Sequence, residues 1–391
     1  MKYPRVVLKP GKEKSVVVNR HPWIFSGAID QFPVMAPGDI ADVYSSSGQF
    51  LARGYFHPDN SIAGRILSFS QEDIESIIKS KIHEAHLLRK SVMRADTNCF
   101  RLINSEADGL PGLVVDKYDD VYVIQVNTCG MDKLKKLVIK NLIDIFTPRC
   151  IYEKSVSSAR DMEGLDPFQG YLFGEPVEEV IVEENGVQFF VSLVEGQKTG
   201  LFLDHREMRR LIADFSKDKK VLNCFAYTGG FSLYALKGGA SHVTSVDISE
   251  TACKYAAKNT HLNQYPSDSH TVVAADVFDF LLEEKDWDYD IVIIDPPAFA
   301  KKRKDIESAT NGYRRLNSLV LSKVKKGTIV LTSSCSYFID KDSFQKIVFQ
   351  AGSETKRDLR ILQHHILSAD HPLSLYHPEG DYLKSLVLYV S

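Results

Sequence analysis

The stretch Lys220–Gly230 has the residue types of a nucleotide-binding turn. Val221 and Leu222 begin a short apolar strand, Thr228-Gly229-Gly230 supplies a turn, and Phe231–Leu236 opens a helix. Glycine lacks a Cβ atom, so a ligand can lie against the backbone at such a turn. The G-x-G-x-x-G spacing of dinucleotide-binding proteins is missing, because the two glycines are adjacent. Few backbone N–H groups would be free for a pyrophosphate, so a cofactor without phosphates fits better.

Two carboxylates follow the next predicted strands. His242–Asp247 is predicted to be a strand that ends in an acid. A carboxylate at that place can accept hydrogen bonds from both ribose hydroxyls of an adenosine-containing cofactor, each bond contributing about 1.5–3 kcal/mol. His270–Asp276 is predicted to be a third strand. Asp276 could accept a hydrogen bond from the adenine amino group, with Val277 as its apolar neighbour, or cap the helix that follows.

Two further predicted strands run into groups that could act on a substrate. Tyr289–Asp295 leads into Asp295-Pro296-Pro297, and Gly327–Ser336 contains Cys335 near its end. Ligands of parallel α/β sheets bind outside the carboxyl ends of the strands. A thiolate is a strong nucleophile, but a free cysteine is more often a small buried hydrophobe. The residue types alone therefore leave the role of Cys335 open, and we expect Cys224 to serve packing.

The elements around these groups alternate between strand and helix from Val221 onward, which predicts a mostly parallel sheet. Strands near residues 359–366 and 383–390 would close it as a hairpin, giving seven strands. With these motifs the chain resembles the class I S-adenosylmethionine (SAM) methyltransferases. More closely, it resembles the bacterial 23S rRNA cytosine-5 methyltransferases that carry an N-terminal PUA domain.

The resemblance implies a multidomain α/β protein. Its parts would be a PUA-like, RNA-binding β-barrel (residues 1–70), a central α+β domain (71–185) and a Rossmann-like, seven-stranded class I methyltransferase domain (186–391). The first part reads as short strands broken by turns, and Ser15–Val18 is expected to be one of these strands. Ser70 is expected to cap a helix that runs from Ile74 to about Met93.

The resemblance also implies SAM as the cofactor. The family carries a segment nearly identical to Gly196–Arg206 that closes over SAM, although the family often has glutamine where this chain has His205. Asn223 also departs from the acid common in the first motif. The implied cofactor contacts are Lys198, Thr199, Phe202, Asp204, Arg206, Phe225, Ala226, Tyr227, Thr228, Gly229, Gly230, Asp247, Ile248, Asp276, Val277, Asp295 and Pro296.

The implied reaction is methylation of C5 of cytosine in 23S rRNA, with Cys335 and Asp295 as the catalytic residues. Because C5 is not nucleophilic, a thiolate must first add to C6. Asp295 would hold the base through its N3 or amino edge. Many RNA cytosine-5 enzymes have a second cysteine after the first proline pair, but Ala298 and Phe299 stand there, so the base that removes the C5 proton is unassigned. The family also suggests a homodimer.

The composition agrees with a cytoplasmic protein. The 391 residues are 44% hydrophobic and 25% charged, and no apolar run approaches the roughly 18 residues that span a bilayer. The six cysteines are dispersed and contain no C-x-x-C pair, so neither a metal site nor a disulfide framework is expected. A net charge of −3 counts against general RNA affinity. A local basic cluster such as Lys301–Lys304 would matter more than the sum.

Three other functions remain open from the sequence. An amino-methyltransferase acting on a purine would use Asp-Pro-Pro followed by an aromatic residue; Ala298 argues against it, and Phe299 keeps it in consideration. A ribosome assembly factor with a vestigial SAM fold would need no catalytic cysteine. A nicotinamide dehydrogenase is the least favoured, because the phosphate-binding turn is wrong.

Overall fold

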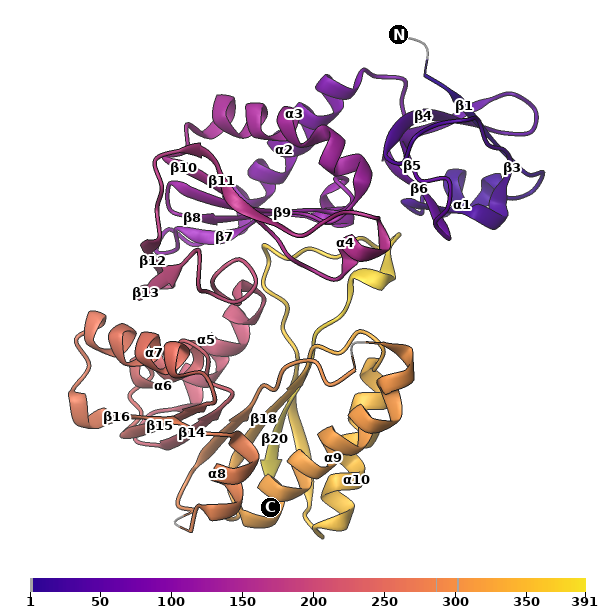
Figure 1. Cartoon of the computed structure of the whole chain (residues 1–391). Helices are drawn as coiled ribbons and strands as arrows, with labels where there is room; N and C mark the ends of the chain where they lie inside the picture. The colour runs from indigo at the N-terminus through magenta and orange to yellow at the C-terminus, as the bar shows by residue number, and fades with distance from the viewer. Residues whose placement is uncertain (1–2, 286, 301) are drawn as a thin grey trace. The chain divides into compact units, whose positions relative to one another are not determined.

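Figure 1 shows the computed structural model of the chain, which describes residues 3–285, 287–300 and 302–391. Lys301, part of the basic cluster noted above, lies outside the described residues. No helix in the described ranges is long and apolar enough to cross a membrane. The chain forms two compact units, one made of Met1–Asn185, Val191–Leu203 and Ser368–Gly380, the other of Gly186–Phe190, Asp204–Leu367 and Asp381–Ser391.

The N-terminal part of the first unit is a six-stranded sheet with the order β2-β6-β5-β4-β1-β3. Strand β1 is parallel to β4 and antiparallel to β3, and one apolar cluster fills the interior. The predicted β-rich character of this region is confirmed. The strands are β1 (Arg5–Leu8), β2 (Trp23–Phe25), β3 (Ile29–Gln31), β4 (Asp39–Tyr44), β5 (Phe50–Phe56) and β6 (Ile62–Ser68).

Two local predictions in this region are wrong. Ser15–Val18 is not a strand, because Glu13–Val17 forms the short helix α1. Only Val16 is buried there while the next two valines are exposed, so the segment does not present the alternating face that a strand buries. Ser70 is not the cap of α2 (Ile74–Val92). Asp73 is, because its carboxylate lies directly before the first helical residue and accepts from the Ser76 N–H at 2.9 Å.

The rest of the first unit is built on a five-stranded sheet with the order β11-β10-β9-β8-β7. Apolar residues of α2 and α3 pack with this sheet in a second cluster. Strand β11 was not predicted, because most of its residues are exposed and two are glycines. The elements are β7 (Cys99–Asn104), β8 (Leu113–Tyr118), β9 (Val121–Val126), α3 (Cys129–Phe146), β10 (Cys150–Ser155), α4 (Ala159–Met162) and β11 (Phe168–Gly174).

Strands β12 (Glu179–Glu184) and β13 (Val187–Ser192) follow, separated by Asn185 and Gly186. These two residues have φ angles of 48° and 72°, as a type I′ turn requires.

The second unit contains a seven-stranded sheet with the order β16-β15-β14-β17-β18-β20-β19. All neighbours are parallel except at β20, which is antiparallel to both β18 and β19. The predicted seven-stranded sheet with a closing hairpin is confirmed. Its elements are α5 (Arg206–Phe215), β14 (Lys220–Cys224), α6 (Gly230–Lys237), β15 (His242–Asp247), α7 (Glu250–Leu262), β16 (His270–Ala274), α8 (Val277–Glu283), β17 (Ile291–Ile294), α9 (Ile306–Lys323), β18 (Ile329–Ser334), α10 (Lys341–Glu354), β19 (Leu359–His364) and β20 (Lys384–Val390).

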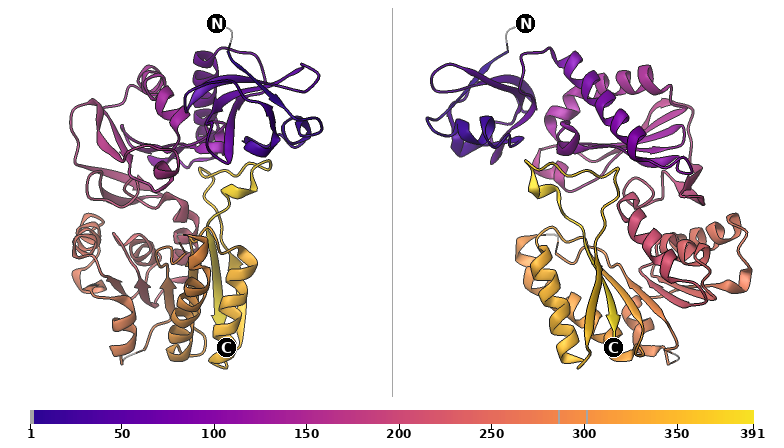
Figure 2. Two further views of the ribbon diagram at one scale, coloured as in Figure 1. Left: turned by 45° about the vertical axis from the view of Figure 1, so that its right-hand side comes forward. Right: turned by 180° about the vertical axis from the view of Figure 1, so that it is seen from behind.

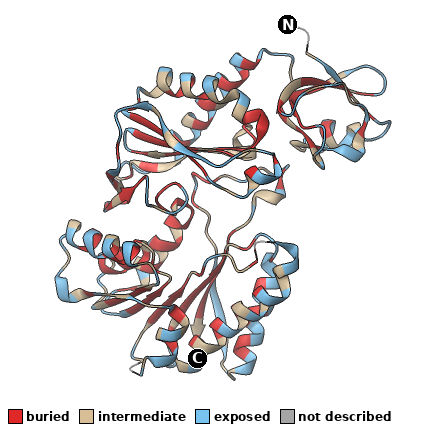
Figure 3. Ribbon diagram, in the orientation of Figure 1, coloured by how far each residue is buried: buried red, intermediate tan, exposed pale blue. Residues whose placement is uncertain are grey.

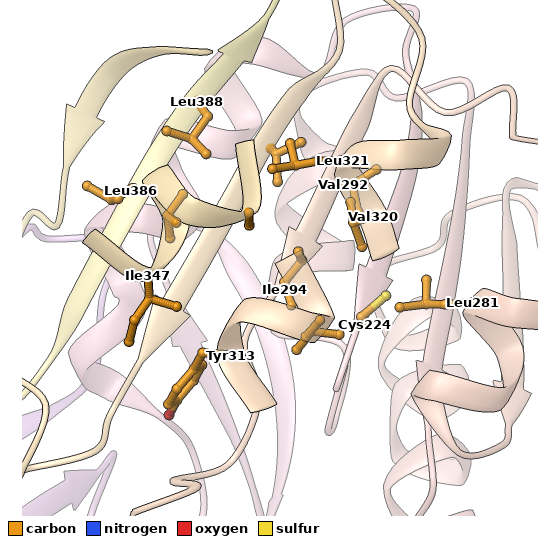
Figure 4. Close-up of a cluster of buried hydrophobic side chains, with 14 of the residues drawn as sticks. Cys224, Leu281, Val292, Ile294, Tyr313, Val320, Leu321, Ile347, Leu386 and Leu388 are labelled. Carbon is orange, nitrogen blue, oxygen red and sulfur yellow. The ribbon is translucent and has the colours of Figure 1, made fainter. Parts of the chain in front are cut away.

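Both faces of this sheet are apolar, so successive strand residues enter two different clusters. Val221 packs with residues of α5 and α6, whereas Leu222 packs with residues of α8, α9 and α10. Helices α9 and α10 also contact each other (Figure 2). Figure 3 shows the central strands as buried along most of their length. Cys224 lies in the same cluster as Leu222, among aliphatic side chains (Figure 4), so the packing role predicted for it is confirmed.

Candidate active site

The parallel strands β14, β15, β17 and β18 end at the same edge of the sheet. The residues that follow them are the ones singled out in the sequence. Phe225 follows β14, Asp247 ends β15, Asp295 follows β17 and Cys335 follows β18. Side chains placed at the carboxyl edge of such a sheet are in position to bind ligands.

The glycine turn after β14 has an unusual backbone. Phe225 and Tyr227 have positive φ angles of 59° and 50°, and Gly229 has 82°. A non-glycine residue in this region costs on the order of 1–3 kcal/mol, and surrounding contacts must hold it. Strand β15 supplies them, because the Ala226 N–H donates to the Val246 carbonyl at 3.0 Å and the Tyr227 N–H donates to Asp247 Oδ2 at 2.8 Å.

Asp247 is therefore fixed by the turn that it supports. Its second oxygen, Oδ1, accepts from the Ser249 N–H at 2.9 Å. A carboxylate can accept about four hydrogen bonds, so the two remaining positions can receive ribose hydroxyls. The next residue, Ile248, leaves 72% of its surface exposed and offers an apolar contact beside the carboxylate.

Asp276 caps α8, since its Oδ1 accepts from the Phe278 N–H at 2.8 Å and the Asp279 N–H at 3.2 Å. The capping role is confirmed, and the adenine contact stays a prediction. Val277 is 2% exposed and packs in the apolar cluster, so a cofactor contact there would have to come from its main chain.

The segment Gly196–Arg206 is divided between the two units. The Thr199 hydroxyl donates to Asp116 Oδ2 at 2.6 Å and lies 3.1 Å from the Tyr118 hydroxyl. This side chain therefore fixes its own loop to the central sheet. Lys198, Thr199 and Phe202 belong to the first unit, with the Lys198 ammonium 4.6 Å from the centre of the Phe202 ring; the buried Asp204 and Arg206 belong to the second.

Cys335 lies beside the Asp-Pro-Pro loop. Its Sγ atom is 4.0 Å from the carbonyl oxygen of Pro296. Of the six cysteines, all within the described ranges, Cys335 alone is not buried. Burial raises the pKa of the Cys129 thiol to about 12 and that of Cys224 further, which keeps these two thiols protonated. The position of Cys335 is thus the one where a thiolate could meet a substrate.

His205 is a site residue that the sequence did not predict. Its Nε2 atom lies 3.2 Å from Asp295 Oδ2, and its side chain is 5% exposed. The His365 ring lies edge-on to it, with ring centres 5.6 Å apart. Burial, with a smaller contribution from His205, lowers the pKa of His365 to about 3, so His365 is neutral near pH 7. The sequence signal that could have indicated this role is a histidine next to an acid within Gly196–Arg206.

In the described part of the chain, no group of three or more His, Cys, Asp or Glu side chains could hold a metal ion.

Comparison with known proteins agrees with this geometry. Residues 164–335 match the family of S-adenosylmethionine-dependent methyltransferases, and residues 6–69 match the PUA-like domains. A candidate methyltransferase crystallised with SAH, SMU.776, shares the fold with a TM-score of 0.83 at 22% identity, covering 99% of this chain and 100% of that one. A candidate SAM-dependent methyltransferase from Streptococcus mutans has a TM-score of 0.82 at 23% identity, covering 98% of this chain and 99% of that one.

Fold and site together define a SAM-dependent methyltransferase with an N-terminal PUA-like domain. The chain is 40% identical over 395 residues to ribosomal RNA large subunit methyltransferase I of Vibrio vulnificus strain YJ016, covering 98% of this chain and 99% of that protein. The same protein of Aliivibrio fischeri strain MJ11 is 39% identical over 392 residues, covering 98% and 99%. The chain belongs to this ribosomal RNA large subunit methyltransferase I family, and the predicted fold class and cofactor are confirmed.

The residues of this chain suit SAM. Asp247 offers acceptors for the ribose, Ile248 offers apolar surface, and the turn at Gly229 lets a ligand approach the backbone. A Cβ atom at Gly229 would also meet the Ala256 methyl group at 3.2 Å, so the turn is closely packed against α7. When bound, SAM supplies an electrophilic methyl group.

Proposed function

We propose that the protein methylates C5 of a cytosine in 23S rRNA, with Cys335 as the nucleophile and Asp295 holding the base. We infer the rRNA substrate from the relatives, which are ribosomal RNA large subunit methyltransferases. The cytosine chemistry depends on one observation: the single unburied cysteine lies against the Asp-Pro-Pro loop, 4.0 Å from the Pro296 carbonyl.

In this reaction the Cys335 thiolate forms a bond to C6 of the cytosine, and the electron pair of the C5–C6 double bond becomes available at C5. After C5 gains its methyl group, a base removes the C5 proton. The double bond then forms again and the thiolate leaves. An unperturbed thiol is only a few per cent ionised near neutral pH, so the site must favour the thiolate.

Asp295 has the placement needed to hold the cytosine. It follows β17, next to β18 and its cysteine, and its side chain is 24% exposed. The contact between His205 Nε2 and Asp295 Oδ2 fixes one carboxylate oxygen, so the other is oriented. We propose that Asp295 accepts from the amino edge of the base while His205 sets its direction.

The packing of Phe299 argues against an amino-methyltransferase. Such an enzyme needs an aromatic ring that is free to grip the target base beside Asp-Pro-Pro. The Phe299 ring instead lies 4.6 Å, centre to centre, from the ring of Tyr313 and packs against the apolar cluster. Ala298 supplies no aromatic ring in its place.

The remaining parts of the chain would hold the RNA around the target. Extruding a base from its stack costs a few kcal/mol, which contacts elsewhere must offset. We propose that residues 1–70 and 71–185 bind the flanking RNA and that residues 186–391 carry the chemistry, in the cytoplasm and as a homodimer. The cofactor contacts would be those named for the glycine turn, Asp247, Asp276, Asp295 and the Gly196–Arg206 segment.

Nucleoside mass spectrometry tests this function. The protein is incubated with 23S rRNA and methyl-labelled SAM, and the RNA is digested to nucleosides. We expect the label in 5-methylcytidine. Label in a methylated purine would refute the cytosine chemistry and reduce Cys335 to a structural residue. Bound SAM without label in naked rRNA or in ribosomal particles would favour the assembly factor.

A further inference from the structure

Lys384, the first residue of β20, places a buried ammonium group beside the cysteine. It pairs in register with Ser334, the last residue of β18, which directly precedes Cys335. Lys384 is only 4% exposed. Its Nζ atom donates to the carbonyl oxygens of Ser336 and Tyr382, both at 2.7 Å. Strand β20 therefore delivers a positive charge to the backbone that carries the thiol.

In the described ranges this buried charge has no carboxylate partner. Among the described residues no carboxylate oxygen lies within 4.0 Å of the Lys384 ammonium, and its two hydrogen bonds go to neutral carbonyls. The nearby acids serve elsewhere: Asp381 pairs with Lys341 at 2.5 Å, and Asp340 accepts from the Ser343 N–H at 2.7 Å at the start of α10. A buried cation without a counter-ion is costly.

The cysteine is the group that can compensate this charge. Burial lowers the pKa of Lys384 to about 8, and among the charges that act in the opposite direction that of Cys335 is the largest. The same attraction favours the thiolate form of Cys335. An ammonium has three N–H donors, and two are used by the carbonyls, so the third can turn toward a thiolate formed at Cys335.

We propose that Lys384 is the counter-ion of the Cys335 thiolate and thereby activates the nucleophile, a proposal that rests on the function proposed for Cys335. The thiol proton leaves to solvent, and the thiolate stays paired with the ammonium until it attacks C6. Lys384 is a positioning residue, because it acts through the cysteine. Ionisable side chains near this pair include Asp381, Lys341 and Asp340, together with Tyr313, whose hydroxyl lies 2.9 Å from Ser336 Oγ.

The test measures the ionisation of Cys335 directly in the full-length protein. Iodoacetamide alkylation is followed from pH 6 to 10, and peptide mass spectrometry quantifies the modification at Cys335. In the wild type we expect half-maximal alkylation below the ordinary thiol pKa of about 8.5. In Lys384→Met the midpoint should rise by at least one pH unit. Methylation at pH 7 should then fall roughly tenfold or more and recover in part at pH 9.

Lys323→Met is the matched control. The Lys323 ammonium also donates to main-chain carbonyls, those of Leu281, Leu282 and Glu284, but Lys323 ends α9 and its ammonium lies at the C-terminal end of α8. Its loss should leave the alkylation midpoint unchanged. Lys384→Arg keeps the charge and should keep the low midpoint.

SAM binding checks that each variant is folded. If Lys384→Met does not fold, the alkylation midpoint of the wild type alone tests the ion pair. A wild-type midpoint at or above about 8.5, or an unchanged midpoint in a Lys384→Met variant that binds SAM, overturns the ion pair. Formation of 5-methylcytidine with an unshifted midpoint refutes the ion pair and leaves the proposed function intact. A shifted midpoint with a methylated purine supports the ion pair and refutes the cytosine reaction.

Discussion

The two halves of the seven-stranded sheet are organised differently. In the half formed by β14, β15 and β16, the key groups are fixed by nearby backbone. Asp247 accepts from the N–H groups of Tyr227 and Ser249, and Asp276 caps the helix that it precedes. In the half formed by β17, β18 and β20, side chains far apart in sequence meet. His205 contacts Asp295, and Lys384 bonds the residue after Cys335.

This difference matches the two tasks of a methyltransferase. A cofactor that is always the same can be held by a rigid turn with backbone donors. A reaction on a base needs ionisable groups whose charge is tuned, and burial next to other ionisable groups does this. Variants in each half should therefore affect different steps.

The largest effect is expected for Cys335→Ala. Without the nucleophile, methyl transfer should fall by at least about 10³-fold, while SAM binding stays unchanged. Steady-state methylation and calorimetric SAM titration measure the two properties. The control, Cys224→Ala, removes a buried thiol in the apolar cluster; it should lower stability by roughly 1–2 kcal/mol and leave the chemistry intact. A Cys335→Ala enzyme with near wild-type activity would contradict the assignment.

Asp247→Ala should have the opposite profile. Losing charge-assisted hydrogen bonds to the ribose should weaken SAM binding by roughly 10- to 100-fold. The Tyr227 N–H also loses its acceptor, so the turn should loosen. Calorimetry gives the affinity, and alkylation of Cys335 should be unaffected because it lies in the other half. Unchanged SAM affinity would remove Asp247 from the cofactor site.

The pH dependence of stability should reveal the buried His270 behind the glycine turn. Burial lowers its pKa to about 4, and its ring nitrogens bond the hydroxyls of Ser245 and Thr260. In the unfolded chain His270 binds a proton as the pH falls through about 6.5, whereas in the folded chain it stays neutral. The stability that neutral His270 contributes is therefore fully present above pH 6.5. The free energy of unfolding should decrease by roughly 2 kcal/mol between pH 6.5 and 5.

Urea unfolding of the wild type and of His270→Gln at pH 7 and pH 5 isolates this term. The variant should be less stable at pH 7 but should lose less stability on acidification. Equal losses in both proteins would show that His270 is not the responsible group.

The smallest effect is expected for Asp276→Ala. Loss of the cap should destabilise α8 by about 1 kcal/mol, seen as a lower melting temperature. If Asp276 also contacts adenine, SAM affinity falls as well. Asp340→Ala, which removes the equivalent cap of α10, should lower the melting temperature to a similar extent without changing SAM affinity. A selective loss of affinity in Asp276→Ala would therefore mark a cofactor contact.

The sequence predicted what depends on local pattern. The alternation from Val221 onward predicted the seven strands, and the carboxyl-edge rule located Asp247, Asp295 and Cys335. Local pattern failed at Ser15–Val18, where valines in a short helix imitate a strand. It also missed β11, whose exposed residues carry no hydrophobic signal.

The long-range partners could not be predicted from the sequence, because they depend on which strand lies next to which. Lys384 reaches the cysteine only because β20 inserts antiparallel beside β18. His205 appeared to be a departure from the family, but the structure places it against Asp295.

The most direct test uses an RNA fragment of 23S rRNA in which the cytidines are replaced by 5-fluorocytidine. Fluorine cannot leave C5 as a cation, so the final elimination is blocked and the cysteine stays bonded to C6. With SAM present, we predict a stable protein–RNA adduct that maps to Cys335 by peptide mass spectrometry and is absent in Cys335→Ala. Failure to form this adduct with an RNA whose unsubstituted form is methylated would contradict the covalent cytosine mechanism.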